Sequence, residues 1–216
     1  MPSEVIGDRV LNHWVDAKNK RGLWRVANLD AYLVGKPDWK VLIDVDALGK
    51  AEGKSWVWHG ANCLAPAYKR CIVALSPGGT DADVAREFDL DTGKFVVGGF
   101  VVPEGKSDIS WVDQDTLLVG RVEGPGTATR SGYPRILKLW QRGSAWSTAT
   151  TVLEGAEADI QVSGWSIMDG NRRHVFLSRG NGFYTSQLSS LGQTGKRSGC
   201  PFRRARLLGT LSEARS

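Results

Sequence analysis

Three acidic residues and a serine lie close together in one turn-rich segment, residues 76–87, of this 216-residue chain. Asp81, Asp83 and Glu87 could supply the two carboxyl groups that hydrolyse a glycosidic bond. Nothing nearby predicts a raised pKa for any of them, so we interpret all three as solvated acids of a turn. Ser76 precedes Pro77, which lacks the amide N–H that an oxyanion hole would use. We therefore predict an interstrand loop without catalytic chemistry.

Nucleophilic catalysis by serine is not predicted elsewhere either. A Gly-x-Ser-x-Gly pentapeptide would place the serine on a sharp turn between a strand and a helix, and the sequence contains none. His13, His59 and His174 are expected on separate strands, without the spacing or the acidic partners of a metal site. We therefore expect no catalytic, cofactor-binding or metal-binding residues, and a chain that is not an enzyme on its own.

Two cysteines and two tryptophans form the remaining pairs with chemical potential. Cys63 and Cys71 flank a predicted hairpin turn and could face each other across it. With Cys200 left over, and with no secretory signal in the first residues, we expect a cytoplasmic protein with free thiols. Trp56 and Trp58 share a strand face and could stack on a ligand. Tryptophans in such positions more often fill the space between packed sheets, and this is our prediction here.

Most of these residues belong to one segment, residues 54–97, that must position them. Its aromatic and β-branched runs are bounded by Pro and Gly, which predicts four short antiparallel strands. Strands this short need neighbouring sheets to cover both faces. The pattern is typical of one blade of a β-propeller.

The rest of the chain looks like imperfect copies of this segment, over residues 9–46, 108–154 and 160–188. Their apolar runs at Leu11, Ile72, Leu118 and Phe176 are 61, 46 and 58 residues apart. Such drift is too large for a strict repeat but suits a propeller with loops of variable length. Strands at intervals of ~8–12 residues also occur in a β-sandwich, so the spacing alone leaves both folds open.

Composition and charge exclude several classes of protein. Nine Trp, 26 Gly and 41% hydrophobic residues suit one turn-rich β domain, and no apolar run of ~18 residues could span a membrane. Six basic residues and one acidic residue lie from residue 189 onward, after 22 basic and 22 acidic residues, so the net charge of +5 belongs to a tail. Without interleaved aromatic residues, nucleic acid is not an expected partner.

Six stretches carry a family resemblance. They read N-H-W-V-D-A-K-N-K-R-G-L-W-R (12–25), W-K-V-L-I-D-V-D-A-L (39–48), A-E-G-K-S-W-V-W-H-G-A (51–61), A-R-E-F-D-L (85–90), D-T-L-L-V-G (115–120) and S-G-Y-P-R-I (131–136). Over residues 12–188 the chain resembles the N-terminal β-propeller of bacterial members of the prolyl oligopeptidase family of serine peptidases. The resemblance implies a seven-bladed propeller that caps an α/β-hydrolase domain and admits only short peptides to a Ser-Asp-His triad.

Together these observations predict an all-β fold. Residues 1–188 are expected to form about four blades, an open and incomplete part of a seven-bladed β-propeller. Residues 189–216 lose the resemblance and the strand pattern, so we expect a basic, disordered tail, which a frameshift would also produce.

The sequence contains no segment that resembles the hydrolase domain. We therefore expect a truncated, non-catalytic propeller whose ancestral role is substrate gating for short peptides. The alternative is a self-standing protein-interaction or peptide-binding module that closes its fold by oligomerising. The expected partners are a peptide substrate, through the missing hydrolase domain, or a second copy bound through exposed blade faces; no membrane partner is expected.

Overall fold

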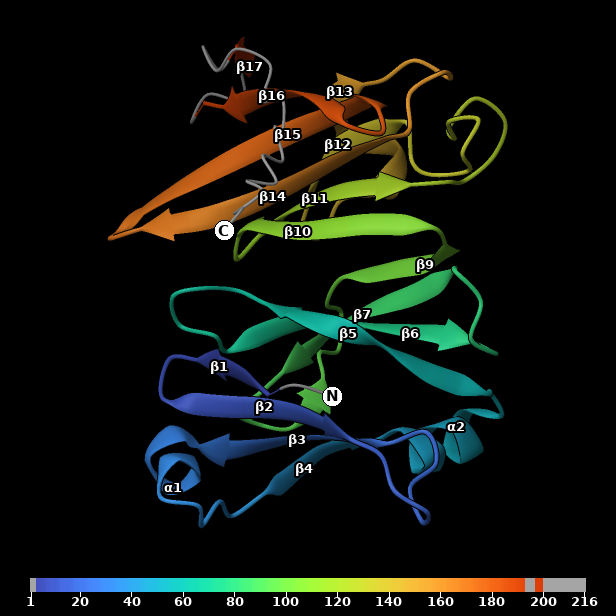
Figure 1. Cartoon of the computed structure of the whole chain (residues 1–216). Coiled ribbons are helices and arrows are strands. Elements are labelled where there is room, and N and C mark those ends of the chain that lie inside the picture. Colours follow the sequence, from blue (N-terminus) through green and yellow to red (C-terminus); the bar gives the residue numbers. More distant parts are fainter. Residues whose placement is uncertain (1–2, 193–196, 200–216) are drawn as a thin grey trace, which may run out of the picture.

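The computed structural model describes residues 3–192 and 197–199, which form four antiparallel sheets. Figure 1 shows the sheets stacked in chain order, with the first at the bottom and the fourth at the top. Within each sheet, strands that follow one another in sequence are hydrogen-bonded neighbours, as in a propeller blade. We number the sheets as blades 1 to 4.

The strands are distributed over the four blades as follows. Blade 1 contains β1 (Glu4–Ile6), β2 (Arg9–Trp14), β3 (Leu23–Asn28) and β4 (Lys40–Asp44). Blade 2 contains β5 (Trp56–Cys63), β6 (Arg70–Pro77), β7 (Asp83–Asp89) and β8 (Lys94–Phe95), with β9 (Val101–Gly105) also paired to β7. Blade 3 contains β10 (Ser107–Asp113), β11 (Thr116–Arg121), β12 (Ile136–Gln141) and β13 (Thr150–Glu154). Blade 4 contains β14 (Gln161–Asp169), β15 (Arg172–Gly182), β16 (Thr185–Leu191) and β17 (Arg197–Gly199).

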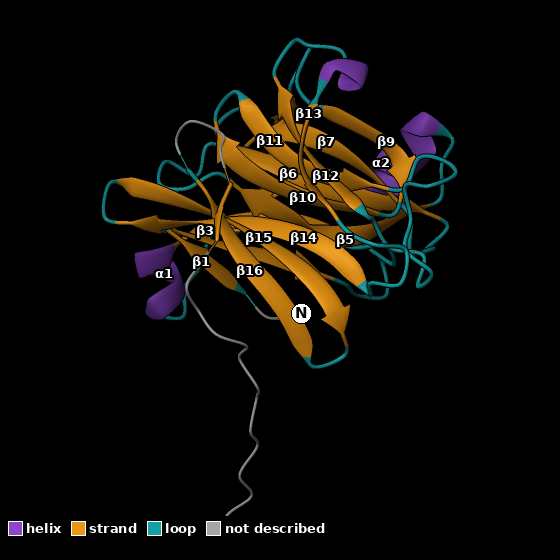
Figure 2. Cartoon of the chain, turned by 90° about the horizontal axis from the view of Figure 1, so that it is seen from above, coloured by secondary structure: helices purple, strands orange, loops and turns teal. Residues whose placement is uncertain are grey.

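Two short α-helices and a 3-10 helix, η1 (Trp146–Thr148), lie at the periphery of the stacked strands in the described part of the chain (Figure 2). α1 (Leu29–Leu33) and α2 (Val45–Glu52) each begin after a residue, Asn28 and Asp44 respectively, whose side chain accepts a hydrogen bond from a backbone N–H of the first turn. α2 ends at Gly53, which has a left-handed backbone that favours glycine. Within residues 3–192, no helix combines the length and the apolar character needed to cross a membrane.

Apolar side chains fill the space between neighbouring blades. Trp24 and Trp56 are buried between blades 1 and 2, with Trp58 packed against them. Trp111 is buried between blades 2 and 3, and Leu137 between blades 3 and 4. Trp56 and Trp58 therefore fill the space between sheets, as predicted.

Hydrogen bonds connect the blades along their first strands. The indole Nε1 of Trp111 on β10 donates to the carbonyl of Asn62 on β5 (2.9 Å), and Ser166 Oγ on β14 donates to the Trp111 carbonyl (2.6 Å). Arg173 on β15 donates to Ser166 Oγ (2.7 Å) and also to the carbonyl of Ala65, in the loop between β5 and β6. Arg173 thus connects blade 4 directly to blade 2.

The arc of blades is open. On β14, Val162 packs into the core shared with blade 3, so alternate residues such as Trp165 and Ile167 face the other way. Both are exposed, as are Val5 and Val41 in blade 1. The structure confirms an all-β, partial β-propeller and excludes the β-sandwich.

Most expected elements are present. Leu11, Ile72, Leu118 and Phe176 all lie on the second strand of a blade, which confirms the alignment of the four copies.

Three strands were not expected. β1 and β9 are additional strands within the body of the fold. β16 continues past the boundary expected at residue 188, and β17 lies within the expected tail. The rest of that tail, Cys200 included, lies outside the described residues.

Candidate functional site

His59 and Asp83 lie side by side, although the sequence analysis did not predict this pair. The register of β5 against β6 shifts between Trp58 and Gly60, so His59 is the extra residue of a β-bulge. Bulges re-aim a side chain and are frequent beside functional sites. His59 Nδ1 lies 2.5 Å from Oδ1 of Asp83, at the start of β7. The prediction that the histidines lack acidic partners is therefore wrong for His59.

The His59–Asp83 pair lines a groove between blades 2 and 3 with a cavity of about 230 Å³. Residues 59–62 of β5 form one wall, and Ser107 and Ile109 of β10 form the other. Ile72 and Ala74 of β6 also line it. Gly60, with φ +133°, has no other atom within 4 Å of the position a Cβ would take, so its backbone is open. We call this cavity the β5–β10 groove.

The electrostatics of the β5–β10 groove are those of one partly desolvated carboxylate. The side chain of Asp83 is only 17% exposed, and burial raises the pKa of its carboxyl, against the opposing effect of the His59 imidazole. None of the residues lining the cavity is a lysine or an arginine. Lys106 is outside the lining set and pairs with the exposed Asp81 at 3.3 Å. The groove can therefore accept hydrogen bonds or a positive charge.

The β5–β10 groove does not have the geometry of a hydrolytic site. A His–Asp pair needs an adjacent nucleophile to act in acyl transfer. Ser107 is the lining residue with a hydroxyl, and no hydrogen bond joins it to His59 within the described part of the chain. The arrangement suits binding better than catalysis.

Glu87 is not the solvated turn acid that we predicted. It is 2% exposed on β7 and accepts hydrogen bonds from Arg142 at 2.8 and 3.1 Å and from the backbone N–H of Phe100 at 2.9 Å. These contacts raise the pKa of the Arg142 guanidinium, chiefly through its hydrogen bond to Glu87. A buried carboxylate needs such compensation, and its partner lies 55 residues away in the chain. Of the three acids, Asp81 is the one that lies exposed in a turn, as expected.

Cys63 and Cys71 form a disulfide, so the prediction of free thiols is wrong for this pair. The two residues are directly opposite each other on β5 and β6, with Cα atoms 3.9 Å apart. That juxtaposition brings their side chains together on one face of the hairpin. The expectation of a reducing compartment favours free thiols, but it carries no information on this local geometry.

The two other histidines are structural. His13 stacks on Trp58 with ring centroids 5.3 Å apart, and its Nε2 is 3.1 Å from the Arg21 carbonyl. Burial lowers the pKa of His13. His174 stacks on Phe176 at 6.4 Å. Both fit the prediction of ordinary strand histidines.

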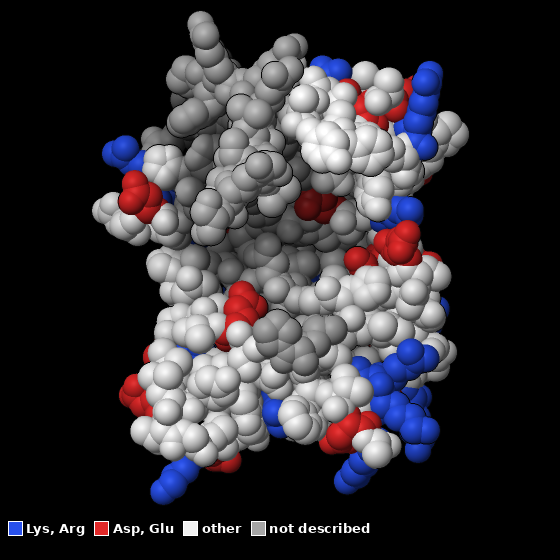
Figure 3. Space-filling model, in the orientation of Figure 1, with Lys and Arg blue, Asp and Glu red and all other residues white. Residues whose placement is uncertain are grey.

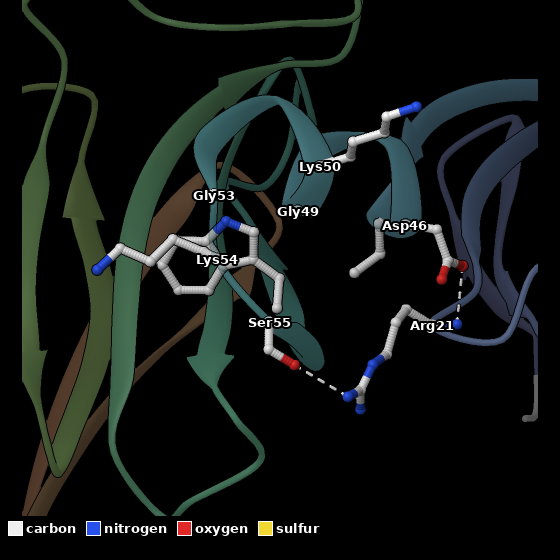
Figure 4. A pocket seen from close by; sticks show the side chains of 9 residues that line it. Arg21, Asp46, Gly49, Lys50, Gly53, Lys54 and Ser55 are labelled. Carbon is white, nitrogen blue, oxygen red and sulfur yellow. Dashed lines mark hydrogen bonds between the residues drawn. The ribbon is translucent and has the colours of Figure 1, made fainter.

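A second hollow, of about 390 Å³, lies where blade 1 joins blade 2 (Figure 4). The backbone N–H of Arg21 donates to Asp46 (2.8 Å), and its guanidinium donates to the Ser55 hydroxyl (3.0 Å). Lys50 and Lys54 point away from this arginine. Arg21, Asp46 and Ser55 are thus paired with one another, and these contacts stabilise the junction of blades 1 and 2.

On the face shown in Figure 3, the described residues do not form a uniformly basic area. Lys and Arg side chains gather at the lower right of Figure 3, but Asp and Glu side chains lie among them. This mixture agrees with the equal numbers of basic and acidic residues before residue 189.

Comparisons with known proteins agree on one family. Residues 7–194 match the family model described as "Prolyl oligopeptidase, N-terminal beta-propeller domain". An uncharacterized peptidase of Sinorhizobium fredii is 40% identical over 190 residues, which cover 87% of this chain and 26% of that protein. An uncharacterized peptidase of Rickettsia prowazekii is 35% identical over 185 residues, covering 81% and 26%.

Solved structures show the same similarity. A post-proline cleaving enzyme from Rickettsia typhi aligns with a TM-score of 0.81 and 32% identity, over 90% of this chain and 30% of that one. A prolyl endopeptidase structure aligns with a TM-score of 0.69 at 15% identity, which shows the fold alone. This chain spans about a quarter of the length of the curated relatives it matches.

Proposed function

The chain belongs to the prolyl oligopeptidase family, in which it matches the N-terminal β-propeller domain, and we propose that it gates the access of short peptides to a catalytic domain without hydrolysing them itself. The observation that carries this proposal is the set of four consecutive blades, held at fixed spacing by three buried cores. A propeller of such blades surrounds a central channel. A narrow channel admits an extended peptide and excludes a folded protein.

Gating requires a rigid channel wall, and the contacts between neighbouring blades support such rigidity. Close-packed interiors resist deformation, and each blade boundary contains such a core. The bonds from Trp111 to Asn62 and from Ser166 to Trp111 further connect the first strands of blades 2, 3 and 4. Substrates would therefore be selected by width, because widening the wall would break these contacts.

A chimera tests the gating proposal. In the Rickettsia typhi enzyme, the segment matching residues 7–192 is replaced by this chain's segment, and the cleavage of a short proline-containing peptide is compared with that of a folded protein containing the same sequence. We expect cleavage of the peptide only. A chimera that cleaves both at similar rates would refute the gating role. The unmodified 216-residue chain, assayed in parallel, is expected to release no product.

A second candidate function rests on the exposed apolar residues of blades 1 and 4. Val5, Val41, Trp165 and Ile167 lie in the two terminal blades and are between 37% and 56% exposed. Exposed apolar surface marks an interaction site where it is contiguous, and we infer such a site on these two terminal faces. The chain on its own would then act as an interaction module that covers these faces by pairing with a second copy.

A further inference from the structure

We propose that the β5–β10 groove binds a cationic group of a peptide, an ammonium or a guanidinium, with Asp83 as its anionic partner. This inference rests on the gating function, because it names the chemical feature that the wall of the channel would recognise. The groove lies between β5 and β10, the first strands of blades 2 and 3. A peptide that passes along the first strands would meet it.

The negative charge of Asp83 in the groove favours a ligand with a positive charge. Asp83 is the one acidic residue among the lining residues, and lysine and arginine are absent from that set. Its partner within the described ranges is the imidazole of His59, whose Nδ1 lies 2.5 Å from Oδ1 of Asp83. A cation placed beside a carboxylate in a partly desolvated groove gains more than it would in bulk water.

The bulge explains why the carboxylate stays available. His59 is the extra residue of the bulge, and its Nδ1 lies 2.5 Å from Oδ1 of Asp83, a buried oxygen that has no hydrogen-bond partner in the described structure. Other acids of blade 2 are differently placed: Glu87 is occupied by Arg142, and Asp89 pairs with Arg70 at 2.7 Å. Asp83 is thus the acid of β7 that faces a cavity without an arginine partner in the described structure.

The size and the lining of the groove limit what can enter. Sites for drug-sized molecules have volumes of about 300–1,000 Å³, whereas this cavity measures about 230 Å³. It can therefore hold one side chain or one terminal residue. Ile72, Ala74 and Ile109 offer apolar contact to the methylene groups of a lysine or arginine, while Asp83 would receive the charged end.

Three C-terminally labelled peptides of one length test the proposal by fluorescence anisotropy, with the complete chain in ~0.15 M salt to screen long-range attraction. The first is acetylated and contains one lysine. The second is acetylated and contains norleucine at that position. The third contains norleucine and has a free N-terminus. We expect at least one cationic peptide to bind about 10-fold more tightly than the neutral peptide, the usual effect of one hydrogen bond to a charged group. The peptide that binds identifies the source of the cation.

Two variants test whether the preference for cationic peptides depends on Asp83. Asp83→Asn should abolish the preference for cationic peptides. Asp81→Asn is the matched control, because it removes the same charge two residues away, on a side chain that is 79% exposed. It should keep the preference. Equal losses in both variants would indicate general electrostatic attraction and overturn the proposal.

The unmutated chain decides the question even if Asp83→Asn fails to fold. Equal binding of all three peptides, or no binding of any, overturns the proposal. The gating function has a separate outcome: a chimera that excludes folded protein while the chain shows no preference for a cation leaves gating intact and removes only the proposed site. If the chain prefers cationic peptides but the chimera cleaves folded protein, the proposed site stands and the gating function is refuted.

Discussion

The ion pair between Glu87 and Arg142 connects two blades through a carboxylate that is almost fully buried. Glu87 belongs to β7 of blade 2, and Arg142 follows β12 of blade 3. The guanidinium also lies 4.6 Å from the ring centroid of Phe100. Loss of the arginine would leave the buried charge with the Phe100 N–H and Arg70, 4.0 Å away, as its remaining partners, which costs more than loss of an exposed pair.

We therefore predict that Arg142→Met lowers the free energy of unfolding by about 3 kcal/mol, the lower end of the range for a broken buried pair, because the arginine is itself 27% exposed. Urea denaturation measures the change. Arg9→Met is the control: its partner Asp91 is 42% exposed, so a loss of at most about 1 kcal/mol is expected. Equal losses would show that the Glu87 pair contributes nothing beyond surface attraction.

Asp16 makes the stability of the β2–β3 turn depend on pH. Its Oδ1 accepts hydrogen bonds from the backbone N–H groups of Asn19 (2.7 Å) and Lys18 (2.9 Å), and its Oδ2 accepts one from the Trp14 indole. These bonds, that of Asn19 above all, lower the pKa of the Asp16 carboxyl from 3.8 to about 2. The carboxylate form is thus favoured in the folded state.

Because the folded pKa lies below the unfolded one, the stabilisation by Asp16 is present above pH 4 and is lost as the pH falls toward 2. We predict that Asp16→Asn lowers Tm at pH 6 and that this difference shrinks steadily between pH 4 and pH 2. Asp38→Asn, at an exposed position, serves as the control in the same series of thermal melts. A difference in Tm that stays constant across this pH range would contradict the assignment.

At the scale of the element, the β5–β6 hairpin is closed by the Cys63–Cys71 disulfide and makes a long-range contact through its loop. The carbonyl of Ala65 in that loop accepts the hydrogen bond from Arg173 of blade 4. The crosslink restricts the unfolded chain and also limits the loop conformations in the folded state. Its removal should therefore affect more than the hairpin itself.

We predict that reduction of this disulfide lowers the free energy of unfolding by about 2–3 kcal/mol, the entropy associated with a short closed loop. Thermal unfolding with and without a phosphine reductant measures the effect. The Cys63→Ser variant should unfold like the reduced protein and should not respond to the reductant. A wild-type protein that does not respond either would show that the thiols remain free in solution.

Most strands could be predicted from the sequence. β6 and β11 are compact apolar runs between turn residues, and such runs were located to within a few residues. β9 was missed because Pro103 and the neighbouring glycines argue against a strand. β1 has three residues, too few for a periodic pattern.

The candidate site was harder to predict than the strands. The bulge at His59 has one signal in the residue pattern, Gly60, because an isolated glycine inside a strand often marks a bulge. The partners of Glu87 and Asp83 depend on register and on the stacking of blades, which bring together residues far apart in the chain. The family motifs did identify the fold, because a resemblance to a known family indicates its fold without any prediction of contacts between distant residues.

At the scale of the whole molecule, the chain has two terminal blades with exposed apolar residues. We predict that it self-associates through blade 4, so that sedimentation velocity shows a species larger than a monomer that grows with concentration between about 1 and 100 μM, the range of affinities of modest interfaces. Trp165→Glu together with Ile167→Lys should restore the monomer, because charges on this face oppose burial.

The control is Leu33→Lys, which alters an apolar residue on the peripheral helix α1 that is more exposed than Trp165 and Ile167. It should leave the association unchanged. A wild-type chain that remains a compact monomer at the highest concentration would contradict the prediction, and the second candidate function with it.

The hydrogen bond from Arg173 to Ala65 joins blades that are not neighbours, so it restrains the curvature of the arc as well as the spacing of its blades. Blades 2, 3 and 4, connected in this way, hold a constant angle to one another, and therefore also to any further blades that would complete the ring. Closing a ring requires the blades to lose orientational freedom relative to one another. For these three blades, most of that loss occurs when they fold. Preorganisation of this kind favours the last contact of an assembly without adding any surface to it.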